Sequence, residues 1–474
     1  MKVEKVLIPG KFEVIHAGHV RLFRMGNKLG KKTIVALDIQ QLSNDEIAWR
    51  IAALKGLTFI DHVETFNSDI FELLSVLKPE IVLKGKEFTN VHNPESDYLK
   101  SFGGKLIFSS GSAYYSDSDL IMKNTYGFNF DIDKKGQEFL SRNNLDKRKA
   151  QIILSLIQNI RTCVIGDLII DEIINCHPVG MSQEEPSIVV TPVDSKKFLG
   201  GAGIVAAHCS ALGSHTTFVT ILGKDENARW GIQKLQESVS KVEIIQDENR
   251  TVNLKQRFKS GKQTLLKLNH FSQNPISVDI EKKVLNYFID NIKKFDLLIL
   301  SDFSFGVISD NLAASLIQAA QQAKIFVASD SQTSSQLGSL IKFKGSNLIT
   351  PTELEARLEI RDENIGLVAL AESLRKKIAT SNILLKLGAD GVFLHGSNSK
   401  NKTIRTDQVP ALNNSPLDLS GAGDSMLAAA ALTLACNGDL YMAAFMGSVM
   451  SAIQVSQVGN KPISKKDIEV LLSQ

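Results

Sequence analysis

Short apolar runs alternate with amphipathic stretches along the first 130 residues of the chain. Runs rich in β-branched and aliphatic residues recur at a spacing that leaves room for one helix between them, and helical periodicity fills the intervals. The apolar runs lie at 3–8, 33–38, 61–66, 80–84 and 105–109, and the helical stretches at 17–29, 43–56, 69–78 and 94–102. Strands and helices that alternate in this way predict a parallel sheet covered on both faces. We therefore expect an α/β domain over residues 1–130.

The pattern changes over residues 131–160, which are first charged and then amphipathic, without a strand signal. We expect a helical connector there that ends in a docked helix. Beyond it, recurring strands with helices between several of them predict a second, larger α/β domain over residues 161–474. Its predicted strands lie at 163–167, 187–193, 216–221, 296–301, 324–329, 346–350, 382–387 and 391–394. Residues 250–268 have β character around a Ser-Gly turn, and together with 172–193 they form a candidate lid.

Composition narrows the class of protein. The 474 residues suffice for two or three domains, and 43% hydrophobic with 22% charged residues is typical of a globular protein with full cores. A net charge of +3 argues against nucleic-acid coating or membrane-surface binding. The start of the chain lacks the apolar segment of a signal peptide, and the apolar stretch 426–435 is too short to span a bilayer. The four cysteines (Cys163, Cys176, Cys209 and Cys436) show no CxxC spacing, which predicts reduced thiols and a cytoplasmic protein.

The most informative segment is the turn from Asp418 to Ser425, which leads into an apolar helix. Its small residues Gly421, Ala422 and Gly423 would let backbone amides converge on one anion at the positive end of that helix. Asp424 at the edge of such an anion hole is poorly placed to bind phosphate but well placed to take a proton from an attacking hydroxyl. An ordinary capped helix with flexible glycines is the alternative.

A second candidate site follows the first predicted strand. The segment Gly10 to His19 opens a helix through a glycine turn and carries His16 and His19 three residues apart. Imidazoles and helix-end amides could donate hydrogen bonds to a nucleoside triphosphate. A metal site and buried structural histidines are the alternatives.

Five segments of the second domain stand in the order found in one enzyme family. They are Val164–Asp167 followed by Asp171, Gly200–Gly203, Leu300–Phe303 followed by Gly306, Leu387–Gly391, and Asp418–Ser425. In this order they resemble the motifs of the ribokinase-like (PfkB) carbohydrate kinases, over nearly the whole domain. The nearer resemblance is to the kinase half of bifunctional ADP-heptose synthases.

That resemblance implies a role for each segment. Asp424 takes the position of the catalytic base. The other implied residues are sugar contacts (Asp167, Asp171, Gly200, Gly201 and Asp302), ATP and anion-hole contacts (Gly388, Gly391, Gly421, Ala422, Gly423 and Ser448) and an indirect Mg²⁺ ligand (Glu355). Three positions depart from the family pattern: Ile204 and Thr352 stand where the family usually has asparagine, and Ser448 where relatives often have it.

The first domain resembles the cytidylyltransferase-like nucleotidyltransferases over residues 1–125. Their GxFDxxHxGH motif appears from Gly10 to His19, with Glu13 in place of the usual aspartate. The resemblance makes His16 and His19 catalytic and implies an in-line attack that needs no covalent intermediate. The implied nucleotide contacts are Gly10, Lys11, Phe12, Arg50, Lys84, Gly85, Lys86, Ser116 and Ser118.

Together the two halves resemble a bifunctional sugar kinase and nucleotidyltransferase with the domain order reversed. The implied fold class is α/β, with an N-terminal Rossmann-like domain and a C-terminal ribokinase-like domain that carries a small β lid. The implied function is synthesis of a nucleotide sugar for lipopolysaccharide or capsule. The implied cofactors are ATP at the kinase site, either ATP or CTP at the transferase site, and Mg²⁺ for both reactions. The implied assembly is a homodimer. A nucleotidyltransferase with a scaffolding kinase domain is one alternative, and a nucleotide-sensing regulatory protein is another.

Overall fold

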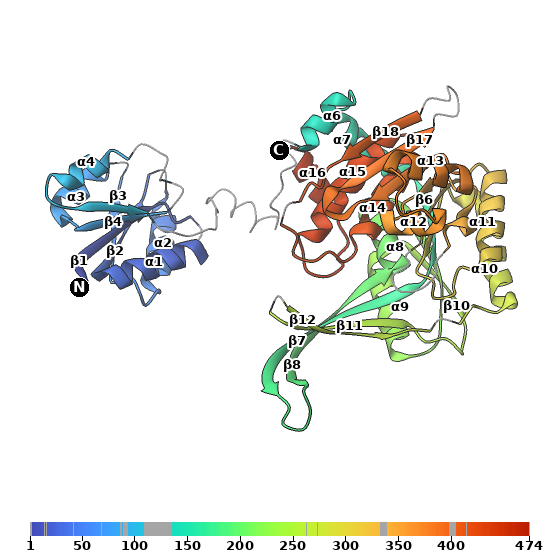
Figure 1. Cartoon of the computed structure of the whole chain (residues 1–474), viewed down its shortest axis with the longest axis horizontal. Coiled ribbons are helices and arrows are strands. Elements are labelled where there is room, and N and C mark those ends of the chain that lie inside the picture. The colour runs from blue at the N-terminus through green and yellow to red at the C-terminus, as the bar shows by residue number, and fades with distance from the viewer. Residues whose placement is uncertain are drawn as a thin grey trace. The chain divides into compact units, whose positions relative to one another are not determined.

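The computed structural model describes residues 2–473 except 14, 16, 41, 68, 86–87, 89–92, 109–134, 262, 273, 332–338, 398–403 and 414. The chain forms two compact units, Met1–Phe128 and Asn129–Gln474, whose elements are labelled in Figure 1. In the described part of the chain, no helix combines the length and the apolar character that crossing a bilayer would require.

The first unit is a five-stranded parallel sheet in the order β3-β2-β1-β4-β5. Its strands are β1 (Val3–Gly10), β2 (Gly30–Asp38), β3 (His62–Phe66), β4 (Ile81–Lys84) and β5 (Lys105–Phe108). Between them lie α1 (Ala17–Leu29), α2 (Asn44–Lys55), α3 (Phe71–Leu77) and α4 (Glu95–Lys100). This is the Rossmann-like strand order: β2 and β3 lie on one side of β1, and β4 and β5 lie on the other, so the order switches between β1 and β4. The predicted N-terminal fold is confirmed.

The core of this unit lies on both faces of the sheet. Val6 and Ile8 of β1 pack with Phe23 of α1 on one face, and Leu7 packs with Leu74 of α3 on the other. Successive side chains of a strand point to opposite faces, so an uninterrupted apolar strand needs helices on both sides. This is why the β1 sequence has no polar alternation.

The second unit contains a nine-stranded sheet in the order β10-β9-β6-β13-β14-β15-β16-β17-β18. Strands from β10 to β16 in this order are parallel, and β17 and β18 add antiparallel pairs at one edge. The strands are β6 (Arg161–Gly166), β9 (His215–Leu222), β10 (Lys241–Gln246), β13 (Leu297–Asp302), β14 (Phe326–Ser331), β15 (Leu348–Ile349), β16 (Asn382–Lys386), β17 (Val392–Ser397) and β18 (Ile404–Val409). The sequence did not predict β10 or β18, because both are half-buried edge strands of mixed polarity.

Helices cover both faces of this sheet. One buried cluster joins α10 and α11 to β6, β13 and β14, and α8 and α14 pack against the same central strands. The helices are α8 (Ala202–Ala211), α9 (Glu226–Ser238), α10 (Val278–Asp290), α11 (Asp310–Gln322), α12 (Glu353–Ile360), α13 (Leu367–Ile378), α14 (Ala422–Ala435), α15 (Leu440–Val455) and α16 (Lys465–Ser473), with short 3₁₀ turns η4 (Ile292–Lys294), η5 (Leu340–Phe343) and η6 (Gly388–Asp390). Helices α14 and α15 are buried along almost their whole length, as helices without a polar face must be.

A separate four-stranded sheet, in the order β12-β11-β7-β8, forms the lid sheet. Its strands are β7 (Leu168–Met181), β8 (Ile188–Gly201), β11 (Asn253–Ser260) and β12 (Gln263–His270), and the long β7–β8 hairpin projects from the unit in Figure 1. The predicted hairpin is β11–β12, and the predicted strand 187–193 belongs to β8. The sequence did not predict β7, whose apolar run is interrupted by Asp171, Glu172 and Asn175.

Residues 137–159 belong to the second unit. They form α6 (Gln137–Arg142), α7 (Lys147–Leu156) and the 3₁₀ turn η3 (Ile157–Asn159). Asp146 caps α7, which packs against α16. Arg142 makes a two-pronged ion pair with Asp407 of β18, at 2.9 and 3.0 Å. These contacts fix the helices against the edge of the main sheet.

Candidate active site

The turn that opens α14 leaves its backbone accessible. Gly421 has a left-handed φ of 75°, and a Cβ there would lie 2.4 Å from Oδ1 of Asn460. Only glycine meets both conditions without strain. At Gly423 an added Cβ would lie 3.2 Å from the ammonium nitrogen of Lys386. The positive end of the helix therefore lies beside a lysine, an arrangement suited to an anion.

Asp424 lies in the first turn of α14 and is only 5% exposed. Burial raises the pKa of its carboxyl to about 7; Asp330 adds to the rise and Lys386 opposes it. A carboxylate with a pKa near neutral pH can both accept a proton and release it. The site therefore suits a general base acting on a hydroxyl group.

Lys386 and Asp330 form a largely buried ion pair next to this carboxylate, with N–O distances of 3.0 and 3.1 Å. Burial would lower the pKa of Lys386, but Asp330 and Glu355 raise it overall, so the lysine stays charged. The sequence reasoning missed both residues. The available signal was the position of Lys386 directly before the Leu387–Gly391 turn.

Glu355 takes part in a capping box at the start of α12. The hydroxyl of Thr352 accepts a hydrogen bond from the Glu355 amide at 3.2 Å, and the Glu355 carboxylate accepts one from the Thr352 amide at 2.7 Å. No cluster of three metal-ligating side chains occurs among the described residues. Mg²⁺ usually keeps several waters and binds through one or two carboxylates together with substrate phosphates. The residues present therefore fit an ion carried by a nucleotide and supported indirectly by Glu355.

Asp167 and Asp302 lie at the carboxyl ends of the neighbouring strands β6 and β13. Oδ2 of Asp167 accepts a hydrogen bond from the Phe303 amide at 3.2 Å, and Oδ1 lies 3.7 Å from Arg250 without a hydrogen-bond partner in the described chain. Burial and the charge of Asp302 raise the pKa of Asp167 to about 6. Asp302 itself pairs with Lys342. A buried carboxylate oxygen of this kind can accept a hydrogen bond from a ligand hydroxyl.

Two glycines at the end of β8 make room for the aspartates. A Cβ at Gly200 would lie 2.4 Å from Oδ2 of Asp171, and one at Gly201, whose φ is 60°, would lie 2.4 Å from the carbonyl oxygen of Asp167. The next residues begin α8, in which Ile204 is fully buried. Ile204 therefore contributes to the core.

Arg257 of β11 links the lid sheet to the turn before α14. Its guanidinium lies 3.7 Å from Asp171 and 3.2 Å from Asp418. Asp418 also accepts hydrogen bonds from the amide and hydroxyl of Ser420. Burial would raise the pKa of Asp418, but Ser420 and Arg257 hold it below its usual value. The lid and the turn are thus joined by charged contacts.

A cavity of about 520 Å³ opens beside the turn. It is lined mostly by apolar side chains, with Lys386 at one side and with Ser448, whose buried hydroxyl has no hydrogen-bond partner in the described chain. Such a cavity suits the flat, largely apolar faces of a nucleotide base. Of the residues implied by the sequence resemblance, it brings together Gly388, Gly391, Ala422, Gly423 and Ser448.

In the first unit, the described candidate residues Gly10, Lys11, Phe12, Lys84 and Gly85 lie at the carboxyl ends of the adjacent strands β1 and β4. Gly10 ends β1, and the carbonyl of Lys11 accepts a hydrogen bond from Arg50 at 3.0 Å. Phe12 is buried and makes an edge contact with the ring of His19, with centroids 5.1 Å apart. Ligands of open α/β sheets bind where the strand order reverses, which is this edge.

At the end of β4, Lys84 precedes Gly85 and is engaged within the unit. Its ammonium pairs with Glu95 and donates a hydrogen bond to Asn93 at 3.1 Å. A triphosphate contact by Lys84 would have to compete with Glu95. The remaining predicted residues of this site, His16, Lys86, Ser116 and Ser118, lie outside the described residues.

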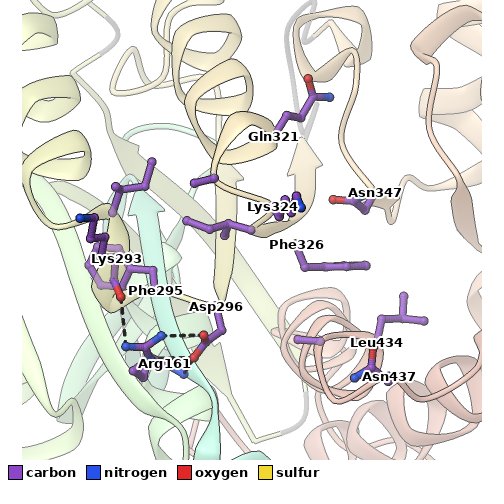
Figure 2. Close-up of a pocket in the computed structure, with 14 residues that line it drawn as sticks. Arg161, Lys293, Phe295, Asp296, Gln321, Lys324, Phe326, Asn347, Leu434 and Asn437 are labelled. Atoms are coloured by element: carbon purple, nitrogen blue, oxygen red, sulfur yellow. Dashed lines mark hydrogen bonds and ion pairs between the residues drawn. The ribbon is translucent and has the colours of Figure 1, made fainter.

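A second cavity, of about 900 Å³, lies at the opposite ends of the strands of the second unit. Figure 2 shows Arg161, at the start of β6, in an ion pair with Asp296, with Lys293, Lys324 and Asn347 around the same hollow. Ligands of parallel sheets bind at the carboxyl ends of the strands. The side with Asp167, Asp302 and Lys386 is therefore the candidate active site.

Comparison with known proteins agrees with this geometry. A family model described as "pfkB family carbohydrate kinase" matches residues 159–466. The chain is 27% identical over 335 residues to "Bifunctional protein HldE" of Trichlorobacter lovleyi, covering 69% of this chain and 66% of that protein. It is 28% identical to the protein of the same name from Sulfurimonas denitrificans, covering 65% and 63%. The chain thus spans just under two thirds of the length of these curated relatives.

Solved structures show the same fold. Phosphofructokinase-2 of Escherichia coli, in complex with substrates and products, aligns with a TM-score of 0.55 at 17% identity, covering 66% of this chain and 99% of that one. Ribokinase of Arabidopsis thaliana aligns with a TM-score of 0.52 at 16% identity, covering 66% and 99%. The predicted ribokinase-like fold with a lid sheet is confirmed. Since the family model matches well over half of the sequence, the chain belongs to the pfkB family of carbohydrate kinases.

Proposed function

We propose that the second unit transfers the γ-phosphoryl group of ATP to a hydroxyl of a sugar phosphate. The observation that carries this proposal is the buried carboxylate of Asp424, with its pKa of about 7, beside the anion-hole turn of α14. Asp424 takes the hydroxyl proton as that oxygen bonds to the γ-phosphorus, and the bond from phosphorus to the bridging oxygen breaks to release ADP. Asp167, Asp171 and Asp302 orient the sugar.

Charge stabilisation supports the same step. Kinases of this family use ATP with Mg²⁺, and phosphoryl transfer depends mainly on positioning and on neutralising the phosphate oxygens. Lys386 and the amides at the start of α14 supply positive charge on the nucleotide side. We propose that Glu355 supports the Mg²⁺ that the triphosphate carries.

For the first unit, we propose nucleotidyl transfer from ATP or CTP to a sugar 1-phosphate. A phosphate oxygen of the sugar attacks the α-phosphorus in line, and pyrophosphate leaves. The Rossmann-like switch point supports this proposal, because Gly10, Phe12 and His19 gather there. By resemblance, the nucleotide contacts also include Lys11, Arg50, Lys84, Gly85, Lys86, Ser116 and Ser118.

The kinase product is a bisphosphate, so a separate phosphatase has to hydrolyse the sugar's other phosphate before the transferase can use the sugar 1-phosphate. With that hydrolysis between them, the two steps would make a cytoplasmic bifunctional enzyme that contributes to a nucleotide sugar for lipopolysaccharide or capsule. We propose domain limits of 1–130 and 161–474, joined by 131–160. A homodimer is supported by exposed apolar side chains on the β7–β8 hairpin. They include Val179, Met181 and Val193, which are 62–71% exposed. Sedimentation of the intact chain measures that state; a monomer at micromolar concentration would contradict it.

The test is product analysis by mass spectrometry, with ATP and CTP offered beside heptose, hexose and pentose phosphates. Wild type should form a sugar bisphosphate, and Asp424→Asn should lower the rate of that step by about 10²- to 10⁴-fold. Asp310→Asn is the matched control, because Asp310 also stands in the first turn of a helix but is exposed. It should keep the wild-type rate.

A nucleotidyltransferase with a scaffolding kinase domain is the second candidate. Thr352 favours it, because its hydroxyl caps α12 and is not free to position a hydrated metal ion. In that case wild type and Asp424→Asn would be equally inactive with every acceptor, and only nucleotidyl transfer would be detected. Titration calorimetry of ATP into both proteins would show whether the scaffold still binds nucleotide.

A further inference from the structure

Lys255 of β11, in the lid sheet, has its ammonium group among three aromatic rings. Its ammonium nitrogen lies 5.8, 5.6 and 5.8 Å from the ring centroids of Phe271, Phe303 and Phe305. Aromatic faces attract a cation but do not neutralise its charge. The three rings therefore hold the lysine side chain in place without accepting a conventional hydrogen bond from its ammonium.

Lys255 differs from the other cations of the cleft. Each of those forms an ion pair with a carboxylate: Arg250 with Asp167, Arg257 with Asp418, Lys342 with Asp302, and Lys386 with Asp330. Among the described residues, the ammonium group of Lys255 has no hydrogen-bond acceptor and no ion-pair partner. An ammonium group held half-buried beside apolar rings is stabilised when an anion joins it.

The location of the rings indicates where that anion would lie. Phe303 directly follows Asp302, and its amide donates to Asp167, so the rings border the sugar-side aspartates. Burial raises the pKa of both Asp171 and Asp424, and the charge of Lys255 opposes each rise. Lys255 is therefore within electrostatic range of both the sugar side and the catalytic base. The nucleotide side already has Lys386 beside Gly423.

We infer that Lys255 binds a phosphate oxygen of the acceptor sugar, and that it makes the kinase select phosphorylated over unphosphorylated sugars. This inference rests on the proposed kinase function and assigns its acceptor specificity to one lid residue. The same chemistry would suit the phosphoryl group in transfer, so the experiment must separate the two sources of phosphate.

The experiment compares Lys255→Met with wild type on two acceptors, an aldoheptose phosphorylated at its terminal carbon and the same aldoheptose without phosphate. Methionine keeps an apolar chain against the rings while removing the charge. We expect KM for the phosphorylated acceptor to rise about 10- to 100-fold, with KM for ATP and for the free sugar within about twofold of wild type. Lys255→Arg, which keeps the charge, should retain most of the preference.

Lys267→Met is the matched control, because Lys267 lies on the neighbouring strand β12 but is exposed. It should keep the wild-type preference, and thermal melting of all variants checks folding. An equal fall in kcat with both acceptors and no change in KM would mean that Lys255 acts on the transferred phosphoryl group, and the inference would be wrong.

If no acceptor is phosphorylated, the proposed kinase function fails, and binding decides the inference separately. Calorimetric titration of the phosphorylated and free aldoheptose would then be compared between wild type and Lys255→Met. Tighter binding of the phosphorylated sugar, lost in Lys255→Met, supports the inference. Equal binding by the two proteins, or no binding at all, overturns it.

Discussion

Burial of the Asp424 carboxyl raises its pKa and also makes its charged form costly. A base that must hold a proton near neutral pH needs a raised pKa, and here burial, with help from Asp330, raises it to about 7. The cost is that the charged form is poorly solvated in the folded protein. Lys386 offsets part of that cost and is itself kept charged by the surrounding carboxylates. The raised pKa of this residue thus comes from its burial and from the charges of its neighbours.

This pKa predicts the pH dependence of the kinase step. Because the base acts in its deprotonated form, kcat/KM should rise with pH, reach half its maximum near pH 7 and level off above it. We would measure kcat/KM between pH 5.5 and 8.5 with discontinuous product assays. Such assays need no coupling enzyme, whose own rate would change with pH. A flat profile over that range would count against Asp424 as the base.

The contribution of Asp424 to folding stability should fall as the pH rises, whereas kcat/KM should rise. The folded-state pKa of Asp424 lies above its ordinary value of 3.8, so folding favours the neutral form. That contribution is complete below about pH 4 and is lost as the pH rises through about 7. Asp424→Asn should therefore gain Tm over wild type by a few degrees as the pH rises from 4 to 8, as measured by thermal melting. An advantage that did not grow with pH would contradict this prediction.

At the scale of elements, the turn before α14, the end of β8 and the middle of β11 meet at the candidate active site. Gly421 permits the left-handed backbone and the close approach of Asn460, and Gly200 and Gly201 admit the aspartates. The sequence pointed to these glycines as a set, since each belongs to a small-residue run before a helix. It could not show that Arg257 of a lid strand reaches Asp418, because that contact joins residues 161 positions apart.

Gly421→Ala should destabilise the second unit by about 1–3 kcal/mol, because alanine at a positive φ is strained and its Cβ would meet Asn460. Chemical denaturation of the intact chain measures the change in the free energy of unfolding. Gly366→Ala is the control: Gly366 has open space around a Cβ and a φ of −66°. An equal effect of the two changes would show that the turn does not require glycine.

At the scale of the whole molecule, two units with separate sheets carry two separate candidate sites. We expect the activities to be separable by single substitutions. His19→Ala should lower nucleotidyl transfer at least tenfold through loss of one phosphate-directed donor, and should leave sugar phosphorylation unchanged. Asp424→Asn should do the reverse.

Mass spectrometry of the products of both variants checks this prediction. With sugar 1-phosphate supplied, Asp424→Asn should still form the nucleotide sugar. With a sugar phosphate and ATP supplied, His19→Ala should still form the bisphosphate. If either substitution abolished both products, the two sites could not be acting independently.

The sequence by itself determined the two α/β folds, because strand–helix alternation is a local pattern that backbone geometry imposes. Its small-residue turns pointed to Asp424 as a candidate base. Only the tertiary structure decided which charges face one another. The Lys386–Asp330 pair, the Arg257 bridge and the ring-bound Lys255 come from strands that are distant in sequence and are brought together at one edge of the sheet or on the lid. Such side chains give no periodic signal along the chain, since their energies depend on burial and on neighbours that folding alone supplies.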